Sequence, residues 1–538
     1  MKTINKISIL VLGLAALTAT SCSDKAFDKY PTDSMQMETY VKNDTEALNI
    51  LYDAYYYLRS ISSSIITING VGTDEAYNGK RNNGVDAIAL NECTWDATFG
   101  ISSSVWSNSY YMINRCNTVT DHDADLKDKS LVAEAKFLRA YAYFNLVRLF
   151  GACPLTTSVI GNYQDLYNYS RESVDNIYQQ IESDLAAAIS GLPESRTAAA
   201  EQGRATKIAA WTLLGEVQMT RGNYSAAKTT LENVINYANA NPSKLGLEEH
   251  VARIYDSTNP NGKEIIFAAQ FNNGATVVAN GFMSSCYING GMPGTQPIYT
   301  FPDGTKFTIT IGGGGGGLLM TWELWNKLRE NPEDERLTKL VYSGTYDTQA
   351  VDTASDEVTV YTDPATGGTH ANIPNTLKYF DFQNQGLSTC RSSCDNIIYR
   401  YGGVLLMYAE CLNETGGDAL KYINMIRTRA GIDEISVSGK DAVKQALEDE
   451  SFRELCFEGH RWFDLLRNKR LKAVMTAHFN HRTPGLSPLH QGSDNGMVVA
   501  DDKATSGTPS VWRYNDDVLF PIPYDQIQLT DWDQNPGY

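Results

Sequence analysis

The densest group of side chains suited to chemistry lies in FRELCFEGHRWFDLLR, residues 452–467. It contains two glutamates, one histidine, one aspartate and three arginines. Carboxylates near a histidine can act as general acids and bases, or they can bind zinc. No nucleophile stands beside a base here, however, and the HExxH spacing that places two histidines on one zinc ion is missing. The residue types suggest an active site, but their spacing does not.

The spacing instead predicts a helix. Apolar residues fall at offsets 0, 3, 4, 11 and 14, on one face of a helix that Gly459 kinks: Phe452, Leu455, Cys456, Phe463 and Leu466. Opposite charges lie three residues apart, as in a surface ladder of ion pairs: Glu458–Arg461, Arg461–Asp464 and Asp464–Arg467. Such pairs contribute only about 0.2–0.5 kcal/mol each. We therefore interpret this stretch as part of the structural frame.

Composition limits the partners of the protein. The chain has 538 residues and a formal net charge of -18, which argues against binding to the phosphate backbone of nucleic acids. It also has 31 tyrosines and 8 tryptophans. Such rings suit half-exposed surfaces that contact a partner both apolar and hydroxylated.

The first residues, MKTINKISILVLGLAALTATSCSDK, predict the location of the protein. Lys2 and Lys6 precede an apolar run, residues 7–18, that is too short for the about 20 residues of a membrane span. The pattern predicts a secretory signal peptide, residues 1–21. Small residues before Cys22 resemble a bacterial lipobox, which implies acylation of Cys22 and anchoring in a membrane. A signal peptide followed by an unmodified cysteine is the alternative.

The sequence predicts no metal site and no cofactor. No cysteines stand in a zinc-like array, and no EF-hand calcium loop occurs, although a structural calcium ion remains open. Cys390 and Cys394 are close enough to pair, but buried free cysteines are as compatible with the pattern. The glycine run at residues 312–317 lacks the GK[ST] ending of a phosphate loop.

Amphipathic helices must form the frame. Apolar residues recur at helical spacing in six segments of the first half: 43–59, 105–121, 130–151, 173–192, 205–222 and 224–240. The short turn RGNY between the last two predicts an antiparallel pair, with Gly215 among the small residues that allow a close approach. Helix, tight turn and helix in units of about 34 residues is the pattern of tetratricopeptide-type repeats.

From residue 267 the chain becomes rich in Gly, Asn, Ser and aromatic residues, with short strand-like runs such as KFTITI. Helices return at residues 396–417 and 418–431. We expect a mainly α fold, with about four helix pairs and an irregular, loop-rich lobe that carries short strands. The expected division is a signal peptide (1–21), a tether (22–42), a helical region (43–265), a ligand-binding region (266–395) and a C-terminal region (396–538).

Several long motifs resemble the SusD-like (RagB/SusD) family of outer-membrane glycan-binding lipoproteins of Bacteroides-type bacteria. They are EAKFLRAYAYFNLVRLFG, IIYRYGGVLLMYAECLNE, YINMIRTRAG, residues 452–467 and LFPIPYDQIQLTDWDQNPGY. Gly402 and Gly403 stand where the family usually carries Ala-Glu. The resemblance implies four tetratricopeptide-like helix pairs that support an irregular lobe. It also implies a protein without catalytic activity that holds oligosaccharides above a SusC-type TonB-dependent transporter.

A sugar site needs aromatic rings for the flat faces of the sugar and polar groups for its hydroxyls. The resemblance places ligand contacts between the first two helices, where the candidates are Asp74, Tyr77, Arg81 and Trp95. A core position for the Trp95 ring is the alternative.

The second group of candidates comes from the loop-rich region: Tyr287, Tyr299, Trp322 and Arg391. One of Trp322 and Trp325 is expected to be a core residue, because the other apolar residues of their helix face inward. Arg391 as an ordinary surface residue is the alternative.

Two other function classes remain as alternatives. A glycoside hydrolase would need two carboxyl groups about 5–10 Å apart across a cleft, and no such pair is singled out, since Asp74 and Glu75 are adjacent. A protein-binding adaptor would instead use a concave surface of the helical repeats.

Overall fold

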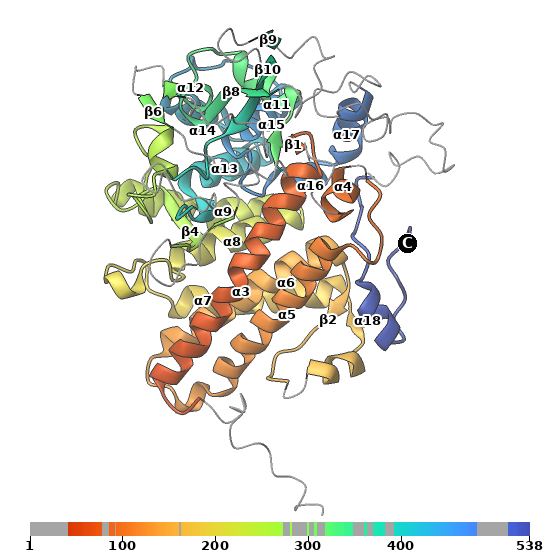
Figure 1. The fold of residues 1–538 in the computed structure, drawn as a ribbon. Helices are drawn as coiled ribbons and strands as arrows, with labels where there is room; N and C mark the ends of the chain where they lie inside the picture. The colour runs from red at the N-terminus through yellow and green to blue at the C-terminus, as the bar shows by residue number, and fades with distance from the viewer. Residues whose placement is uncertain are drawn as a thin grey trace, which may run out of the picture.

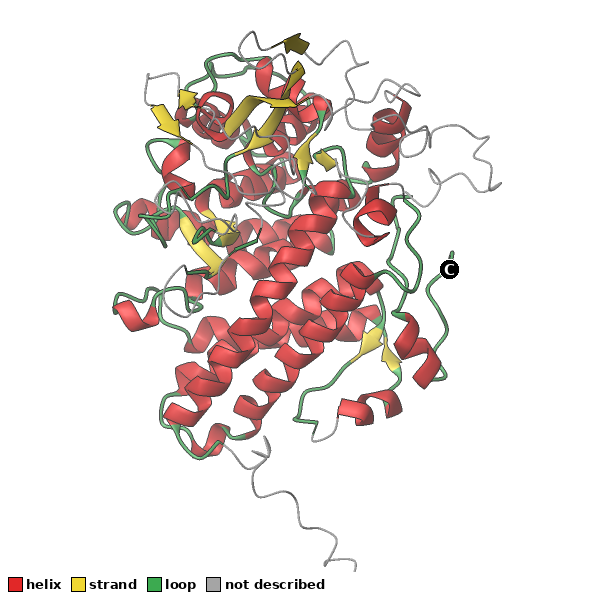
Figure 2. Cartoon of the chain, in the orientation of Figure 1, coloured by secondary structure: helices red, strands yellow, loops and turns green. Residues whose placement is uncertain are grey.

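The computed structural model describes residues 41–77, 85–91, 93–160, 163–272, 280–281, 298–300, 306–308, 318–347, 360–362, 369–381, 392–480 and 515–538. Helices fill the lower part of the molecule in the view of Figure 2, and the strands lie mainly in its upper part. No described helix is long and apolar enough to cross a membrane.

The helical frame begins with α3 (Asp44–Val71), whose first backbone N–H groups are capped by the Asn43 side chain. Each helix of the first half packs on the next in chain order (Figure 1). The helices that follow α3 in this stack are α5 (Gly100–Asp121), α6 (Lys129–Phe150), α7 (Val174–Gly191), α8 (Lys207–Thr220) and α9 (Tyr224–Ala240). The short helix α4 (Val85–Asn91) lies between α3 and α5 in sequence.

Gly215 is needed where α8 meets α9. A Cβ atom at this position would lie 2.4 Å from Cδ2 of Leu231, closer than side-chain carbons approach one another. The expected antiparallel pair with a close approach is therefore confirmed.

After α9 the chain enters the irregular lobe. Its described strands form small sheets: β4 (Ile265–Ala269) with β11 (Asn396–Arg400), β5 (Ile298–Thr300) with β6 (Lys306–Thr308), and β10 (Thr369–Thr376) between β8 (Val341–Asp347) and β9 (Val360–Thr362). Two short helices, α11 (Trp322–Arg329) and α12 (Glu335–Leu340), lie among them. A further small sheet, β2 (Cys153–Pro154) with β3 (Arg171–Glu172), follows α6.

The chain then returns to the frame, because α13 (Tyr401–Thr415) packs on α9 and pairs with α14 (Leu420–Arg429). The remaining described helices are α15 (Lys440–Glu454), α16 (Arg461–Arg467), α17 (Leu471–Asn480) and α18 (Tyr524–Leu529). The C-terminal tail closes onto the end of α6, where Phe520 N–H donates to Leu149 O at 2.7 Å. Four helix pairs and an irregular lobe with short strands confirm the expected fold.

Residues 452–467 are not one helix. α15 ends at Glu454 and α16 begins at Arg461, and the connection contains two residues with positive φ, Phe457 (62°) and Gly459 (84°). The kink expected at Gly459 is therefore a complete break. The five apolar residues still face inward, four of them buried and Leu466 partly so.

The surface ladder expected within this stretch is wrong. Glu458 is buried and bonds to Arg400 and Lys378, while Arg461 is buried and bonds to Asp74. Of the three expected pairs, only Asp464–Arg467 forms, at 2.8 Å. The Glu458–Arg461 pair fails because the chain is not helical between Glu454 and Arg461, and the Arg461–Asp464 pair fails because Arg461 bonds to Asp74 instead.

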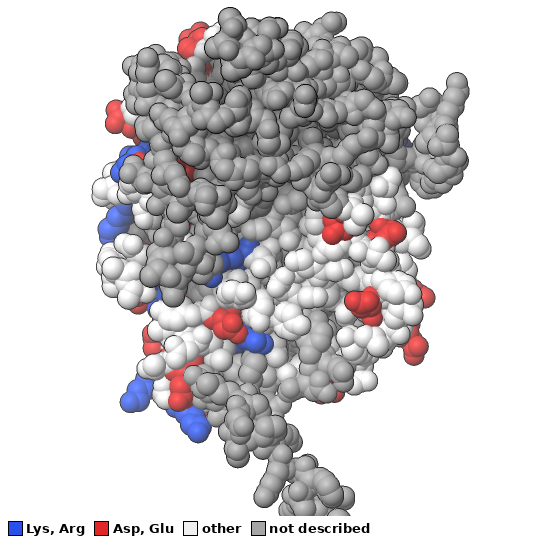
Figure 3. All heavy atoms as spheres, viewed as in Figure 1, with Lys and Arg blue, Asp and Glu red and all other residues white. Residues whose placement is uncertain are grey.

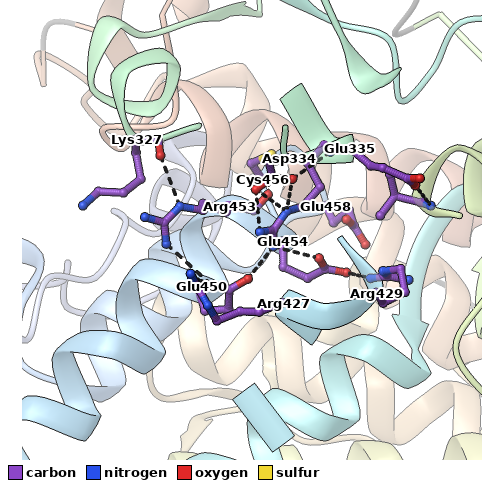
Figure 4. A network of polar contacts seen from close by, with 12 residues as sticks. Lys327, Asp334, Glu335, Arg427, Arg429, Glu450, Arg453, Glu454, Cys456 and Glu458 are labelled. Atoms are coloured by element: carbon purple, nitrogen blue, oxygen red, sulfur yellow. Dashed lines mark hydrogen bonds and ion pairs between the residues drawn. The ribbon is translucent and has the colours of Figure 1, made fainter. Parts of the chain in front are cut away.

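In place of the ladder, the described lobe and frame share a buried network of ion pairs (Figure 4). Glu454 is its centre and bonds to Arg336, Arg400 and Arg429. Glu450 joins Arg336 and Arg427 at 2.6 and 3.0 Å. These residues come from α12, β11, α14 and α15, so the network ties four elements together.

Candidate functional site

Two loop-bearing segments far apart in the sequence meet in one small sheet. β1 (Ala76–Tyr77), which follows α3, pairs antiparallel with β7 (Leu319–Met320), which precedes α11. The register joins Ala76 to Met320 and Tyr77 to Leu319. These are the two segments in which the sequence placed the ligand-binding residues. We call this pairing the β1–β7 junction.

Thr321 fastens the junction from the lobe side. Its Oγ1 donates to Asp74 O at 2.5 Å, and its N–H donates to Glu75 O at 3.2 Å. The same side chain caps α11, because Leu324 N–H donates to Thr321 Oγ1 at 3.2 Å. One buried threonine therefore fixes both the strand pair and the start of α11.

The C-terminal region bonds to the two residues that precede β1, Asp74 and Glu75. Arg461 donates two hydrogen bonds to the Asp74 carboxylate, at 2.9 and 2.8 Å. Glu75 accepts a hydrogen bond from the backbone N–H of Phe457, in the break between α15 and α16. Burial raises the pKa of Glu75 to about 8, against the opposing effect of that hydrogen bond. Residues 74–75 are thus set by groups nearly 400 positions away, because the C-terminal helices pack on the end of α3.

Asp74 and Tyr77, two of the predicted ligand contacts, are core residues in this structure. Asp74 is 6% exposed and its two carboxylate oxygens are taken by Arg461. Tyr77 is 1% exposed. The prediction of direct contact is corrected for both, because both side chains are buried.

Trp95 requires the same correction. The ring is 1% exposed and lies 5.2 Å from Phe520 and 6.2 Å from Trp462, measured between ring centroids. Its Nε1 donates to the hydroxyl of Tyr538 at 2.7 Å. A sugar would find both ring faces covered, so the alternative of a core ring holds.

The other predicted contacts remain predictions. Arg81, Tyr287 and Arg391 lie outside the described residues, as does the predicted acylation site Cys22. Tyr299 lies in β5 and Trp322 is the first residue of α11, directly after the junction.

The structure also bears on the tryptophans of α11, on Cys394 and on metal binding. Trp325, on α11, is partly buried and packs against the main core, as expected for one of the two tryptophans there. Cys394 is buried and free, and burial raises the pKa of its thiol to about 12, while Cys390 lies outside the described residues. Within the described ranges, no group of three or more His, Cys, Asp or Glu could hold a metal ion.

Sequence reasoning missed the residues that position the junction. Thr321 carries a signal, since a threonine directly before a short amphipathic run is typical of a helix N-cap. Arg461 was noticed, but it was assigned to a surface ladder. Glu75 gave no signal, because nothing in its neighbourhood indicates that it is buried beneath a distant backbone N–H.

Comparisons with known proteins agree with this architecture. The family model described as "SusD family" matches residues 263–538, which is half of the chain, and one described as "Starch-binding associating with outer membrane" matches residues 25–219. SusD-like protein P2 of Formosa agariphila is 25% identical over 495 residues, covering 87% of this chain and 90% of that protein.

Solved structures share the fold. A SusD homolog from Bacteroides thetaiotaomicron has a TM-score of 0.71 at 21% identity, covering 93% of this chain and 98% of that one. A laminarin-binding SusD-like protein has a TM-score of 0.69 at 22% identity, covering 93% and 100%. With a family model over half of its length and the same helical frame and lobe, this chain belongs to the SusD family.

Proposed function

We propose that the protein is a non-catalytic cell-surface lipoprotein that binds oligosaccharides or polysaccharide and delivers them to a SusC-type TonB-dependent transporter. The observation that carries the proposal is the β1–β7 junction. It pairs Ala76–Tyr77 with Leu319–Met320, so the two loop-bearing segments that carry the predicted contacts meet at one place. Rigid support beneath such loops keeps the entropy cost of binding low.

The proposed contacts are five of the residues predicted from the sequence: Arg81, Tyr287, Tyr299, Trp322 and Arg391. Aromatic rings would stack on sugar faces, and the arginines would donate to hydroxyl groups. A carbohydrate ligand is supported by the laminarin-binding neighbour and by the starch-binding description of the second family model.

The proposed location follows from the N-terminus and from the family. Residues 1–21 would be removed and Cys22 acylated, which fixes a protein at a membrane when two or more chains are attached. The description of the second family model, which names the outer membrane, supports this location.

The proposal is tested by affinity electrophoresis of the lipid-free protein in gels that contain soluble starch, laminarin, xylan, galactomannan or anionic polygalacturonate. We expect retardation by at least one neutral polysaccharide. Trp322→Ala should reduce it by about tenfold or less, since a stacked ring contributes about 0.5–1.5 kcal/mol beyond its burial. Tyr524→Ala is the matched control, because Tyr524 is an exposed aromatic residue on α18 (49% exposed).

Two further measurements address catalysis and delivery. The chain length of the bound polysaccharide should stay unchanged after long incubation, and EDTA should leave retardation unchanged because the proposed contacts include no metal ion. The acylated protein should co-purify with a TonB-dependent transporter from outer membranes. Shortening of the polysaccharide would instead indicate a glycoside hydrolase, and peptide binding without any glycan binding would indicate an adaptor.

A further inference from the structure

The outer faces of α3 and α5 carry a group of tyrosines far from the β1–β7 junction. Tyr52 and Tyr56 on α3 are 46% and 55% exposed, and Tyr111 on α5 is 37% exposed. Tyr57 lies between them, with ring centroids 5.5 Å from Tyr56 and 5.4 Å from Tyr111. The rings therefore form one continuous surface across both helices.

A polar pair borders these rings. Arg115 Nε donates to the Asp53 carboxylate at 2.6 Å, and the guanidinium carbon of Arg115 lies 5.4 Å from the ring centroid of Tyr57. The side chains of Arg115 and Asp53 are 20% and 42% exposed. Donors and acceptors therefore stand at the edge of the aromatic surface, within reach of solvent. We call these six residues the tyrosine face: Tyr52, Asp53, Tyr56, Tyr57, Tyr111 and Arg115.

The α5 side of the tyrosine face carries few charges. Of the 22 residues of α5, only Arg115 and Asp121 are charged. In Figure 3 the area over α5 is mostly white, while red and blue residues lie over the lower half of α3. A surface with few charges suits a neutral ligand better than an ionic one.

We propose that the tyrosine face is a second binding surface for neutral polysaccharide. Half-exposed rings offer flat apolar faces, and their hydroxyl groups, together with Asp53 and Arg115, match the hydroxyls of a sugar. The exposed large hydrophobic residues of α3 and α5 are all tyrosines, without the exposed aliphatic or methionine anchors typical of helix-binding or protein-binding grooves. The ligand class rests on the proposed function, but the location does not.

α3 connects the tyrosine face to the β1–β7 junction. Tyr57 precedes Val71, the end of α3, by 71 − 57 = 14 residues, which is about 21 Å along a helix axis. The β1–β7 junction lies beyond that end. A polysaccharide held at both places would dissociate more slowly than from either alone, because the second contact forms at a high effective concentration.

The test uses the full lipid-free chain in the same polysaccharide gels. The double variant Tyr56→Ala/Tyr111→Ala removes two exposed rings and is expected to weaken retardation by a long neutral polysaccharide about tenfold. Binding of a short oligosaccharide, measured by calorimetry, should not change. Tyr169→Ala/Tyr524→Ala is the matched control, since both tyrosines are comparably exposed on other parts of the surface.

The outcomes separate the two proposals. Retardation that responds to Trp322→Ala but not to Tyr56→Ala/Tyr111→Ala overturns the tyrosine face and leaves the proposed function intact. Retardation that responds to Tyr56→Ala/Tyr111→Ala but not to Trp322→Ala supports the tyrosine face and contradicts the loops as the binding site. No retardation of the unaltered protein by any neutral polysaccharide contradicts both. Loss of transporter co-purification with unchanged retardation identifies the face as a protein contact and overturns the inference.

Discussion

Arg400 donates two hydrogen bonds to the carboxylate of Glu458 in the interior of the protein, from Nε at 2.7 Å and from Nη2 at 3.0 Å. Each side chain is 1% exposed. Arg400 ends β11, and Glu458 lies in the break between α15 and α16, so the pair joins the returning frame to the segment that supports the junction. Lys378 shares the same carboxylate at 2.7 Å.

Glu458→Ala should destabilise the protein by about 3–5 kcal/mol, because it leaves two buried cations without their shared partner. Thermal or urea unfolding measures the effect. Glu414→Ala is the control, since its partner Lys440 is solvent-exposed, and a change within about 0.5 kcal/mol is expected there. Equal effects of the two variants would contradict the structural role of the network.

The same carboxylate predicts a loss of stability in acid. Burial alone would raise the pKa of Glu458, but Arg400 and Lys378 outweigh it and lower the pKa from 4.5 to about 2. The folded state therefore binds the proton less tightly than the unfolded state. Stability from this group is present above pH 4.5 and is lost as the pH falls towards 2. Glu458→Gln should make the unfolding midpoint less dependent on pH between pH 4.5 and 2. An unchanged pH dependence would argue against the buried pair.

The pH dependence of stability expected from Glu75 is opposite to that expected from Glu458. Its folded-state pKa of about 8 lies above the ordinary 4.5, so its contribution is fully present below pH 4.5 and is lost as the pH rises through 8. Glu75→Gln keeps an acceptor for Phe457 N–H and removes the titration. The variant should gain stability relative to the unaltered protein at pH 8 and not at pH 4, as measured by unfolding at both values. An equal gain in stability at pH 8 and at pH 4 would show that Glu75 does not have a raised pKa in the folded protein.

Two neighbouring glycines in α13 should respond oppositely to alanine. A Cβ at Gly403 would meet only Leu455 Cδ2, at an ordinary 3.7 Å, and Gly403 lines a cleft. Gly403→Ala should stabilise by about 0.5–1 kcal/mol through helix propensity. A Cβ at Gly402 would lie 2.5 Å from Arg400 Nη1, so Gly402→Ala should cost about 1–3 kcal/mol. Thermal or urea unfolding of both variants measures these changes, and equal changes in the free energy of unfolding would contradict the geometry.

Trp95→Ala tests the corrected role of this ring. Loss of a buried tryptophan among Phe99, Trp462 and Phe520 should cost about 3–5 kcal/mol. Trp95→Phe keeps a ring and loses the hydrogen bond to Tyr538, so a smaller cost of about 1 kcal/mol is expected. A Trp95→Ala protein with unchanged stability and lost polysaccharide retardation would restore the original assignment to the ligand.

Helical periodicity and long motifs were sufficient to predict the frame, but the ends of helices were harder. α3 was expected to end near residue 59 and runs to Val71. The extension SISSSIITINGV is rich in serine and β-branched residues, which are weak helix formers. Its isoleucines are buried in the main core, so tertiary packing, which no local pattern reports, decides the outcome.

The site was harder to predict than the frame, because burial depends on partners remote in sequence. Asp74 looks like a loop carboxylate until Arg461 is placed against it. Trp95 looks like a platform for sugars until the C-terminal Phe520 and Tyr538 cover it. What could be predicted was which two segments bear the loops, and the β1–β7 junction shows that these segments meet.

We propose that the segments paired at the β1–β7 junction bind a carbohydrate without altering it. The most direct measurement is affinity electrophoresis of the lipid-free protein in neutral polysaccharide gels, with the size distribution of the polysaccharide followed over a day. We predict retardation that Trp322→Ala weakens and Tyr524→Ala does not, with no shortening of the chains. Migration unaffected by every neutral polysaccharide would contradict carbohydrate binding, and the release of shorter oligosaccharides would contradict binding without cleavage.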